Sequence, residues 1–193
     1  MSDIYRKFYP VVAVLISIRT VALCTALVWL FFLSPVNASD PTPKTSSATI
    51  ESITDGDTLV IRIGSKRERI RLIGIDTPES HPNRRAQAQS ERSHQDMKTI
   101  VSLGLRASDF TRSLLPPGSH VRIEYDVEAR DRYGRLLGYV WLGDGRMANE
   151  TIIRSGYAYP LTVPPNIRYR QRFHEAFSEA RGARRGLWSN PVR

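Results

Sequence analysis

Residues 69–79 read RIRLIGIDTPE, and this stretch predicts a strand whose inward-facing side changes midway. Its apolar residues before and after the change are Ile70 and Leu72, then Ile73 and Ile75. Side chains in a strand alternate between two faces, so a switch from even to odd positions requires one extra residue, a β-bulge, which fits at Gly74. With that bulge Arg71 and Asp76 share a face, whereas an unbroken strand would place them on opposite faces.

Short alternating segments on both sides of this stretch predict a small β-barrel. The predicted strands are one that begins at Ala48, then 59–63, 69–75, 121–125 and 137–142. Apolar residues at three- and four-residue steps predict a helix over 97–114, ended by Pro116-Pro117-Gly118. Asn149 and Asn166 are predicted N-caps of two later helices, and Gly156 ends the first of these. Three strands, a helix, two strands and further helices predict an α+β, mainly β fold: a five-stranded OB-like Greek-key barrel with about three flanking helices.

The first 38 residues predict an export signal or a membrane anchor. Basic residues precede an uncharged run over 20–33 of about fourteen residues, which is the length of a signal-peptide core and shorter than a bilayer span. Small or β-branched residues then suit cleavage after Ala38. The anchor alternative stays open because residues 11–18 extend the apolar stretch, interrupted only by Arg19. Residues 39–47 are rich in Pro, Ser and Thr and predict a linker, so the domain is expected over 48–190.

Charge and cysteine content limit the function classes. The 193 residues carry a formal charge of +9 and suit one domain. Without residues 1–38, which hold three basic residues and one acidic residue, the charge is still +7. A nucleic acid, an anionic membrane surface or simple solvation of a basic surface would each account for this charge. The only cysteine, Cys24, lies in the apolar run, which excludes disulfides and cysteine-based metal sites from the domain.

Asp57, in the Asp-Gly-Asp-Thr stretch 55–58, is the first candidate ligand. Taken alone the stretch is typical of a turn, but Asp57 shares the strand parity of the apolar residues at 59, 61 and 63. It therefore points toward the core, where a carboxylate is costly unless a positive charge compensates it. A hard cation with oxygen ligands is one candidate for that charge.

Three segments together supply the groups that phosphodiester hydrolysis needs. Asp57 and Asp76 can hold a divalent cation, and Glu79, expected as a free carboxylate at the strand rim, can take a proton from water. Arg71 and Arg135 can bind the phosphate in a bidentate manner. An oxygen-only ligand set favours calcium or magnesium over zinc.

The motifs DGDT (55–58), RLIGIDTPE (71–79), DRYGR (131–135), NETIIRSGYA (149–158) and RGLW (185–188) make residues 50–188 resemble the thermonuclease, or staphylococcal-nuclease-like, family. The resemblance implies cleavage of DNA and RNA on the 5′ side of the phosphodiester, leaving 3′-phosphates. It also implies Ca²⁺ bound by Asp57, Asp76 and the Thr77 carbonyl. Its implied catalytic and substrate-binding residues are Glu79 as general base or water-positioning group, Arg71 and Arg135 as phosphate ligands, and Arg132 and Tyr133 at the nucleotide pocket.

Two stretches depart from the family pattern. The family's best-known member uses two tyrosines for nucleotide contacts in the loop after the helix of the NE motif, where this chain has LTVPP at 161–165. Residues 80–102 are longer than in that member and basic, which fits either a lid over the substrate path or a solvated loop. Preference for DNA or RNA therefore stays open.

Three other functions are alternatives to a nuclease. An OB-fold module that binds nucleic acid without catalysis would not need all five acid and arginine positions. A histidine-based metal phosphodiesterase would need ligand spacing that the four histidines lack; they are His81, His94, His120 and His174. A basic membrane-surface protein leaves the carboxylates unexplained. We expect a monomer exported to the periplasm or medium, or anchored in the membrane with the nuclease domain outside the cytoplasm.

Overall fold

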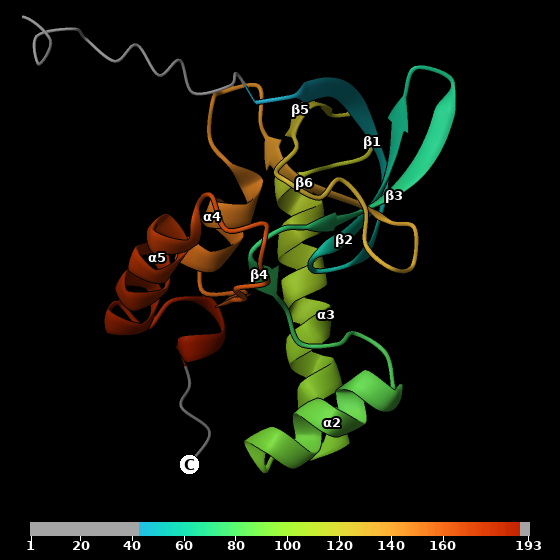
Figure 1. Ribbon diagram of the computed structural model, residues 1–193. Coiled ribbons are helices and arrows are strands. Elements are labelled where there is room, and N and C mark those ends of the chain that lie inside the picture. Colours follow the sequence, from blue (N-terminus) through green and yellow to red (C-terminus); the bar gives the residue numbers. More distant parts are fainter. Residues whose placement is uncertain (1–42, 190–193) are drawn as a thin grey trace, which may run out of the picture. The chain divides into compact units, whose positions relative to one another are not determined.

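The computed structural model describes residues 43–189, in which five strands close into a barrel (Figure 1). The barrel strands are β1 (Thr45–Asp55), β2 (Thr58–Ile63), β3 (Lys66–Leu72), β5 (His120–Glu124) and β6 (Leu136–Trp141). Their order is β1-β2-β3-β6-β5, and β1 also pairs with β5, which closes the ring. The β3–β6 pair is parallel and the other pairs are antiparallel. The predicted OB-like barrel is confirmed, and its first strand begins three residues before Ala48.

Between residues 43 and 189, four α-helices and one 3-10 helix lie outside the barrel. They are α2 (Arg84–Ser93), α3 (Met97–Leu114), α4 (Ala148–Arg154), α5 (Arg170–Gly182) and η1 (Gly186–Trp188). The predicted helix over 97–114 has the expected bounds. It packs against β1 and α4, and α5 packs against α4 (Figure 1). Residues 84–93, predicted as part of a lid or solvated loop, instead form α2, which packs on α3.

Both asparagines predicted as helix caps have other roles. Asn149 lies inside α4, fully buried, where its Oδ1 accepts from the Val140 amide at 2.9 Å and its Nδ2 donates to the Ile73 carbonyl at 2.8 Å. Asn166 precedes α5 by several residues and forms two 2.8 Å hydrogen bonds with the Glu128 backbone. Tertiary partners therefore decide the role of each side chain, whereas the local pattern is only compatible with a cap.

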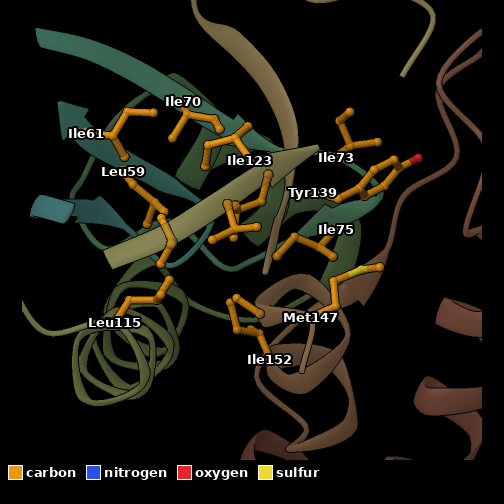
Figure 2. Close-up of a cluster of buried hydrophobic side chains, with 14 of the residues drawn as sticks. Leu59, Ile61, Ile70, Ile73, Ile75, Leu115, Ile123, Tyr139, Met147 and Ile152 are labelled. Atoms are coloured by element: carbon orange, nitrogen blue, oxygen red, sulfur yellow. The ribbon is translucent and has the colours of Figure 1, made fainter. Parts of the chain in front are cut away.

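The core fills the barrel and continues between the barrel and the helices. Figure 2 shows strand residues Leu59, Ile70 and Ile123 facing Leu115 at the end of α3 and Ile152 of α4. Each of these five residues is fully buried, with 0% of its surface exposed. This continuous apolar contact fixes α3 and α4 against the barrel, and both helices reach the site described below.

The predicted break in the strand at Gly74 is confirmed. β3 ends at Leu72, and after a turn at Ile73 and Gly74 the chain resumes as β4 (Ile75–Asp76), which leaves the barrel to pair with β7 (Tyr159–Pro160). Gly74 has φ +81°, and a Cβ there would lie 2.3 Å from the Phe173 ring. Only glycine therefore fits both the left-handed backbone and the close approach of α5.

Residues 1–42 and 190–193 lie outside the described part, and with them the predicted signal or anchor (1–38) and the first four residues of the predicted linker (39–47). Residues 45–47 belong to β1, so the linker prediction was wrong for these three residues. Between residues 43 and 189, no helix has the length and apolar character needed to cross a membrane.

We predict that Gly74→Ala lowers the free energy of unfolding by about 2–4 kcal/mol, because it adds overpacking against Phe173 to the backbone strain. The control is Gly64→Ala in the β2–β3 turn, which also has positive φ but meets no heavy atom within 4 Å. That control should lose only about 1 kcal/mol. Urea unfolding of both variants checks this, and equal losses would show that the contact with α5 is unimportant.

Candidate active site

Asp57 is held at the mouth of the barrel by the turn between β1 and β2. Its side chain is almost completely buried, at 2% exposure for the residue. Oδ2 accepts from the Thr77 backbone amide at 3.1 Å, and Oδ1 accepts from the Thr58 hydroxyl at 3.0 Å. The predicted inward direction of Asp57 is therefore confirmed, and its carboxylate ties β2 to the segment after β4.

Arg71, near the end of β3, lies between the two candidate metal-binding carboxylates. Its guanidinium forms an ion pair with Asp57 through Nη1, and its Nη2 donates to Asp76 Oδ1 at 2.9 Å and to the Ile75 carbonyl at 3.3 Å. The residue is only 8% exposed. Breaking a buried pair leaves an uncompensated charge, so Arg71→Ala would remove stability as well as any catalytic contribution.

The mutual burial of these charges shifts their pKa values. Burial acts to lower the pKa of the Arg71 guanidinium, but the Asp57 and Asp76 carboxylates outweigh it and raise that pKa. Burial raises the pKa of Asp76, and nearby Asp57 adds to the shift, while Arg71 opposes it. Burial, together with the charges of Asp57 and Glu79, also raises the pKa of Asp55. Burial is thus the main cause of both raised carboxyl pKa values, and the neighbouring carboxylates add to it.

Glu79 is buried and bound, whereas the sequence predicted a free carboxylate at the rim. The residue is 6% exposed. Its Oε1 pairs with Arg85 Nε at 3.0 Å, and its Oε2 accepts from Asn83 Nδ2 at 2.9 Å. Its backbone amide donates to Gln89 Oε1 at 3.0 Å. The prediction failed because residues 84–93 fold into α2, whose first turns cover this carboxylate.

Helix α3 packs against the two chain segments that carry the acidic residues. A Cβ at Gly104 would lie 2.2 Å from the Glu79 carbonyl, so this glycine lets the helix backbone approach the Glu79 segment directly. One turn further, the Ser108 hydroxyl donates to Asp55 Oδ1 at 3.3 Å, and the Thr111 hydroxyl donates to the Gly56 carbonyl at 2.8 Å. Both acid-bearing turns therefore rest on one rigid helix.

Arg135, Arg132 and Tyr133 lie together in the 131–135 turn before β6. Arg135 is bound to Asp131, with Nε and Nη2 each 2.7 Å from Oδ2. The Arg132 guanidinium carbon lies 4.8 Å from the centre of the Tyr133 ring, and Nη2 donates to the Tyr133 hydroxyl at 2.7 Å. Tyr133 is 69% exposed, which leaves its ring accessible to a ligand.

A cleft of about 620 Å³ extends from this turn to Arg71 and Arg85, the two arginines that pair with the acidic residues. Its lining includes Arg71 and Arg85 on one side and Arg132, Tyr133 and Arg135 on the other. The aliphatic residues Leu161, Val163 and Pro164 complete the wall. The structure thus gathers the predicted site residues in two groups: Asp57, Arg71, Asp76, Thr77 and Glu79 around the barrel mouth, and Arg132, Tyr133 and Arg135 across the cleft.

Sequence reasoning missed the residues through which α2 joins the site. Arg85 contacts both Asp76 and Glu79, at 3.3 and 3.0 Å. Gln89 binds the Thr77 carbonyl at 3.2 Å as well as the Glu79 amide. One signal was available: Asn83 precedes a run of helix-favouring residues and caps α2 by accepting from two backbone amides.

The residues at the barrel mouth fit a divalent cation in charge and chemistry. Four carboxylates (Asp55, Asp57, Asp76 and Glu79, together the acid cluster) face two guanidinium groups, Arg71 and Arg85, which leaves an excess of two negative charges. Every donor atom is oxygen, as calcium and magnesium prefer. The Thr77 hydroxyl is buried with no hydrogen-bond partner among residues 43–189. In that same range, no group of three or more Asp, Glu or His side chains is already arranged to hold a metal ion.

The fold and site define a class: an OB-like barrel that carries carboxylates and arginines suited to phosphate esters. Comparison with known proteins identifies the family. The model for the staphylococcal nuclease homologue family matches residues 69–190. The chain belongs to this family.

Individual relatives agree with the family match. The thermonuclease of Staphylococcus intermedius is 36% identical over 173 residues, covering 86% of this chain and 93% of the relative. The thermonuclease of Staphylococcus hyicus is 36% identical over 155 residues, covering 80% and 79%. Endonuclease YncB of Bacillus subtilis (strain 168) is 30% identical over 149 residues, covering 76% of this chain and 63% of that protein. The protein is a hydrolytic nuclease. The alternative interpretation, an OB-fold module that only binds nucleic acid, is therefore rejected.

We predict that Asp55→Asn increases the free energy of unfolding at pH 7. The pKa of Asp55 is raised by folding, so its charged form opposes folding, and asparagine keeps the acceptor for Gly56 and Ser108. The gain should shrink as pH falls through the raised pKa and disappear below the ordinary value of 3.8, where both states of the wild type hold the proton. Denaturant unfolding across pH checks this. Asp109→Asn, an exposed carboxylate on α3, is the control and should show no comparable gain.

Proposed function

We propose that the protein is a calcium-dependent endonuclease that hydrolyses phosphodiester bonds of DNA, RNA or both by cation-assisted attack of water. The observation that supports this most is the excess of two negative charges in the acid cluster, beside a cleft lined by arginines. A site that attracts a dication next to one that attracts phosphate is the arrangement that this chemistry needs.

In this proposal Asp57, Asp76 and the Thr77 carbonyl hold the cation. When bound, calcium would polarise a phosphoryl oxygen and offset charge in the transition state. Asp57 and Asp76 keep their relative positions because Arg71 and the Thr77 amide bind them. Magnesium fits the oxygen donors less well, since it demands a near-ideal octahedral geometry.

Glu79 is the proposed general base or water-positioning group. Its Oε2 accepts from Asn83 Nδ2 and its backbone amide donates to Gln89 Oε1, and these two contacts fix its orientation. A carboxylate held in this way can accept a proton from water aimed at the phosphorus. Burial at 6% exposure limits competing solvent around it.

Arg71 and Arg135 are the proposed phosphate ligands, and both line the cleft. A guanidinium offers paired N–H donors that match a phosphate and neutralise charge as it develops. Arg132 and the exposed ring of Tyr133 are proposed to contact the nucleotide beside that phosphate, since aromatic faces and guanidinium planes stack on bases. The aliphatic side chains of Leu161, Val163 and Pro164 in the cleft wall offer a base no polar group for recognition, which fits low base preference.

We predict that calcium stabilises the protein and is required for cleavage. At 10 mM Ca²⁺ the melting temperature should rise by about 3–10 °C, as expected for a dissociation constant of about 0.1–1 mM and a domain of this size. Asp57→Asn should lose most of the shift. A calcium-specific chelator should stop hydrolysis of DNA and RNA. Undiminished cleavage in the chelator would contradict the metal assignment.

Glu79→Gln and Arg135→Ala should each lower kcat by at least about a hundredfold while the fold survives. Glutamine keeps the hydrogen bond from Asn83, and Arg135 contacts only its own turn through Asp131. Arg130→Ala is the matched control, because Arg130 pairs with Glu68 and donates to the Gly134 carbonyl but does not line the cleft. Steady-state rates with circular dichroism decide this. Turnover near the wild-type value in either site variant would place the chemistry elsewhere.

We also propose that the protein acts outside the cytoplasm. The sequence of residues 1–38 has the order that an export pathway recognises, and residues 39–193 contain no cysteine that an oxidising compartment would affect. A weak calcium site also suits an environment rich in calcium. Cell fractionation should find a shortened, active protein outside the cytoplasm. Full-length protein in the membrane would favour the anchor alternative, and full-length active protein in the soluble cytoplasm would contradict export.

A further inference from the structure

Arg85 places a positive charge on two carboxylates of the acid cluster from outside the barrel. Its Nε lies 3.0 Å from Glu79 Oε1, and its Nη2 lies 3.3 Å from Asp76 Oδ1. The Asp76 oxygen is the same atom that accepts from Arg71. Arg85 also lines the cleft, so its guanidinium is within reach of both the carboxylates and the space proposed for substrate.

The backbone that carries Arg85 is firmly fixed. Asn83 caps α2 by accepting from the amides of Arg85 and Ala86 at 2.8 and 2.9 Å. Ala86 is fully buried, and Gln89 one turn later binds both the Glu79 amide and the Thr77 carbonyl. The start of α2 is therefore anchored beside the acid cluster, and only the long Arg85 side chain is free to change partners.

The two arginines of the acid cluster differ in how tightly they are held. The Arg71 side chain is 10% exposed and contacts both Asp57 and Asp76. The Arg85 side chain is 53% exposed. Half-exposed ion pairs contribute little to stability, so a dication attracted to the same carboxylates can displace Arg85 far more readily than Arg71.

We propose that Arg85 is an exchangeable counter-ion of the acid cluster. It pairs with Asp76 and Glu79 before the cation arrives, and once the cation is bound it turns to the substrate phosphate in the cleft. This inference rests on the proposed calcium site. It requires removal of Arg85 to have two effects of opposite sign: tighter calcium binding and weaker substrate binding. A purely structural role for Arg85 would weaken both.

The test is calcium titration of the full chain by isothermal calorimetry, without nucleic acid. Arg85→Ala and Arg85→Gln should bind calcium about three- to tenfold more tightly than wild type, because a competing positive charge a few ångströms away is removed. Arg84→Ala is the matched control: Arg84 is an exposed neighbour on the same turn, and its variant should stay within about twofold of wild type. Arg85→Lys, which keeps the charge, should lie close to wild type.

The second measurement is the KM for single-stranded DNA at saturating calcium, with circular dichroism to verify folding. KM should rise about three- to tenfold in Arg85→Ala and Arg85→Gln and stay unchanged in Arg84→Ala. Equal calcium affinity in wild type and both Arg85 variants, or an unchanged KM, would overturn the exchange while leaving the proposed function intact. Failure of every form, including wild type, to bind calcium would contradict the proposed function and this inference with it.

Discussion

The buried guanidinium of Arg71, held between Asp57 and Asp76, is the contact on which the rest of the site depends. It joins β2, β3 and β4, and it exists only because the chain leaves the barrel at Gly74 and carries Asp76 back to the face of Arg71. Asn149 of α4 holds that break by donating to the Ile73 carbonyl, and the Leu161 amide does the same for the Gly74 carbonyl at 2.9 Å. Core packing of α4 is thereby linked to the position of the two carboxylates.

Charge is distributed unevenly between the barrel mouth and the cleft beside it, and the functional interpretation depends on this difference. Acidic groups exceed basic ones at the barrel mouth, whereas the cleft beside it is lined by arginines from α2, β3 and the 131–135 turn. Burial raises the pKa of Asp55 and that of Asp76, and the charge of Asp57 adds to both shifts. Folding therefore stores an unfavourable charge balance at one place, as functional sites commonly do, and a bound cation would relieve it. The similarity to two thermonucleases indicates that this charge balance serves nuclease chemistry.

The features that could be predicted from sequence were those with a local periodic signal. The break at Gly74 followed from a change of parity, although a turn between two strands replaces the predicted bulge. The helix over 97–114 followed from its apolar repeat. The failures involve contacts between segments distant in sequence. Asn149 has the local features of a cap, yet it is consumed by tertiary hydrogen bonds, and Glu79 is buried because α2 folds over it. Arg85 was part of a basic stretch without a signal for its partners, since no local pattern encodes which carboxylate a long side chain reaches.

We propose that the acid cluster organised by Arg71 is the cation site of this nuclease. Anomalous X-ray scattering from crystals grown with calcium tests it most directly. We expect one strong anomalous peak within calcium–oxygen bonding distance, about 2.3–2.6 Å, of the Asp57 and Asp76 carboxylates. A strong peak at other acidic residues, such as Glu124 and Asp126, with none beside Asp57 and Asp76, would contradict it.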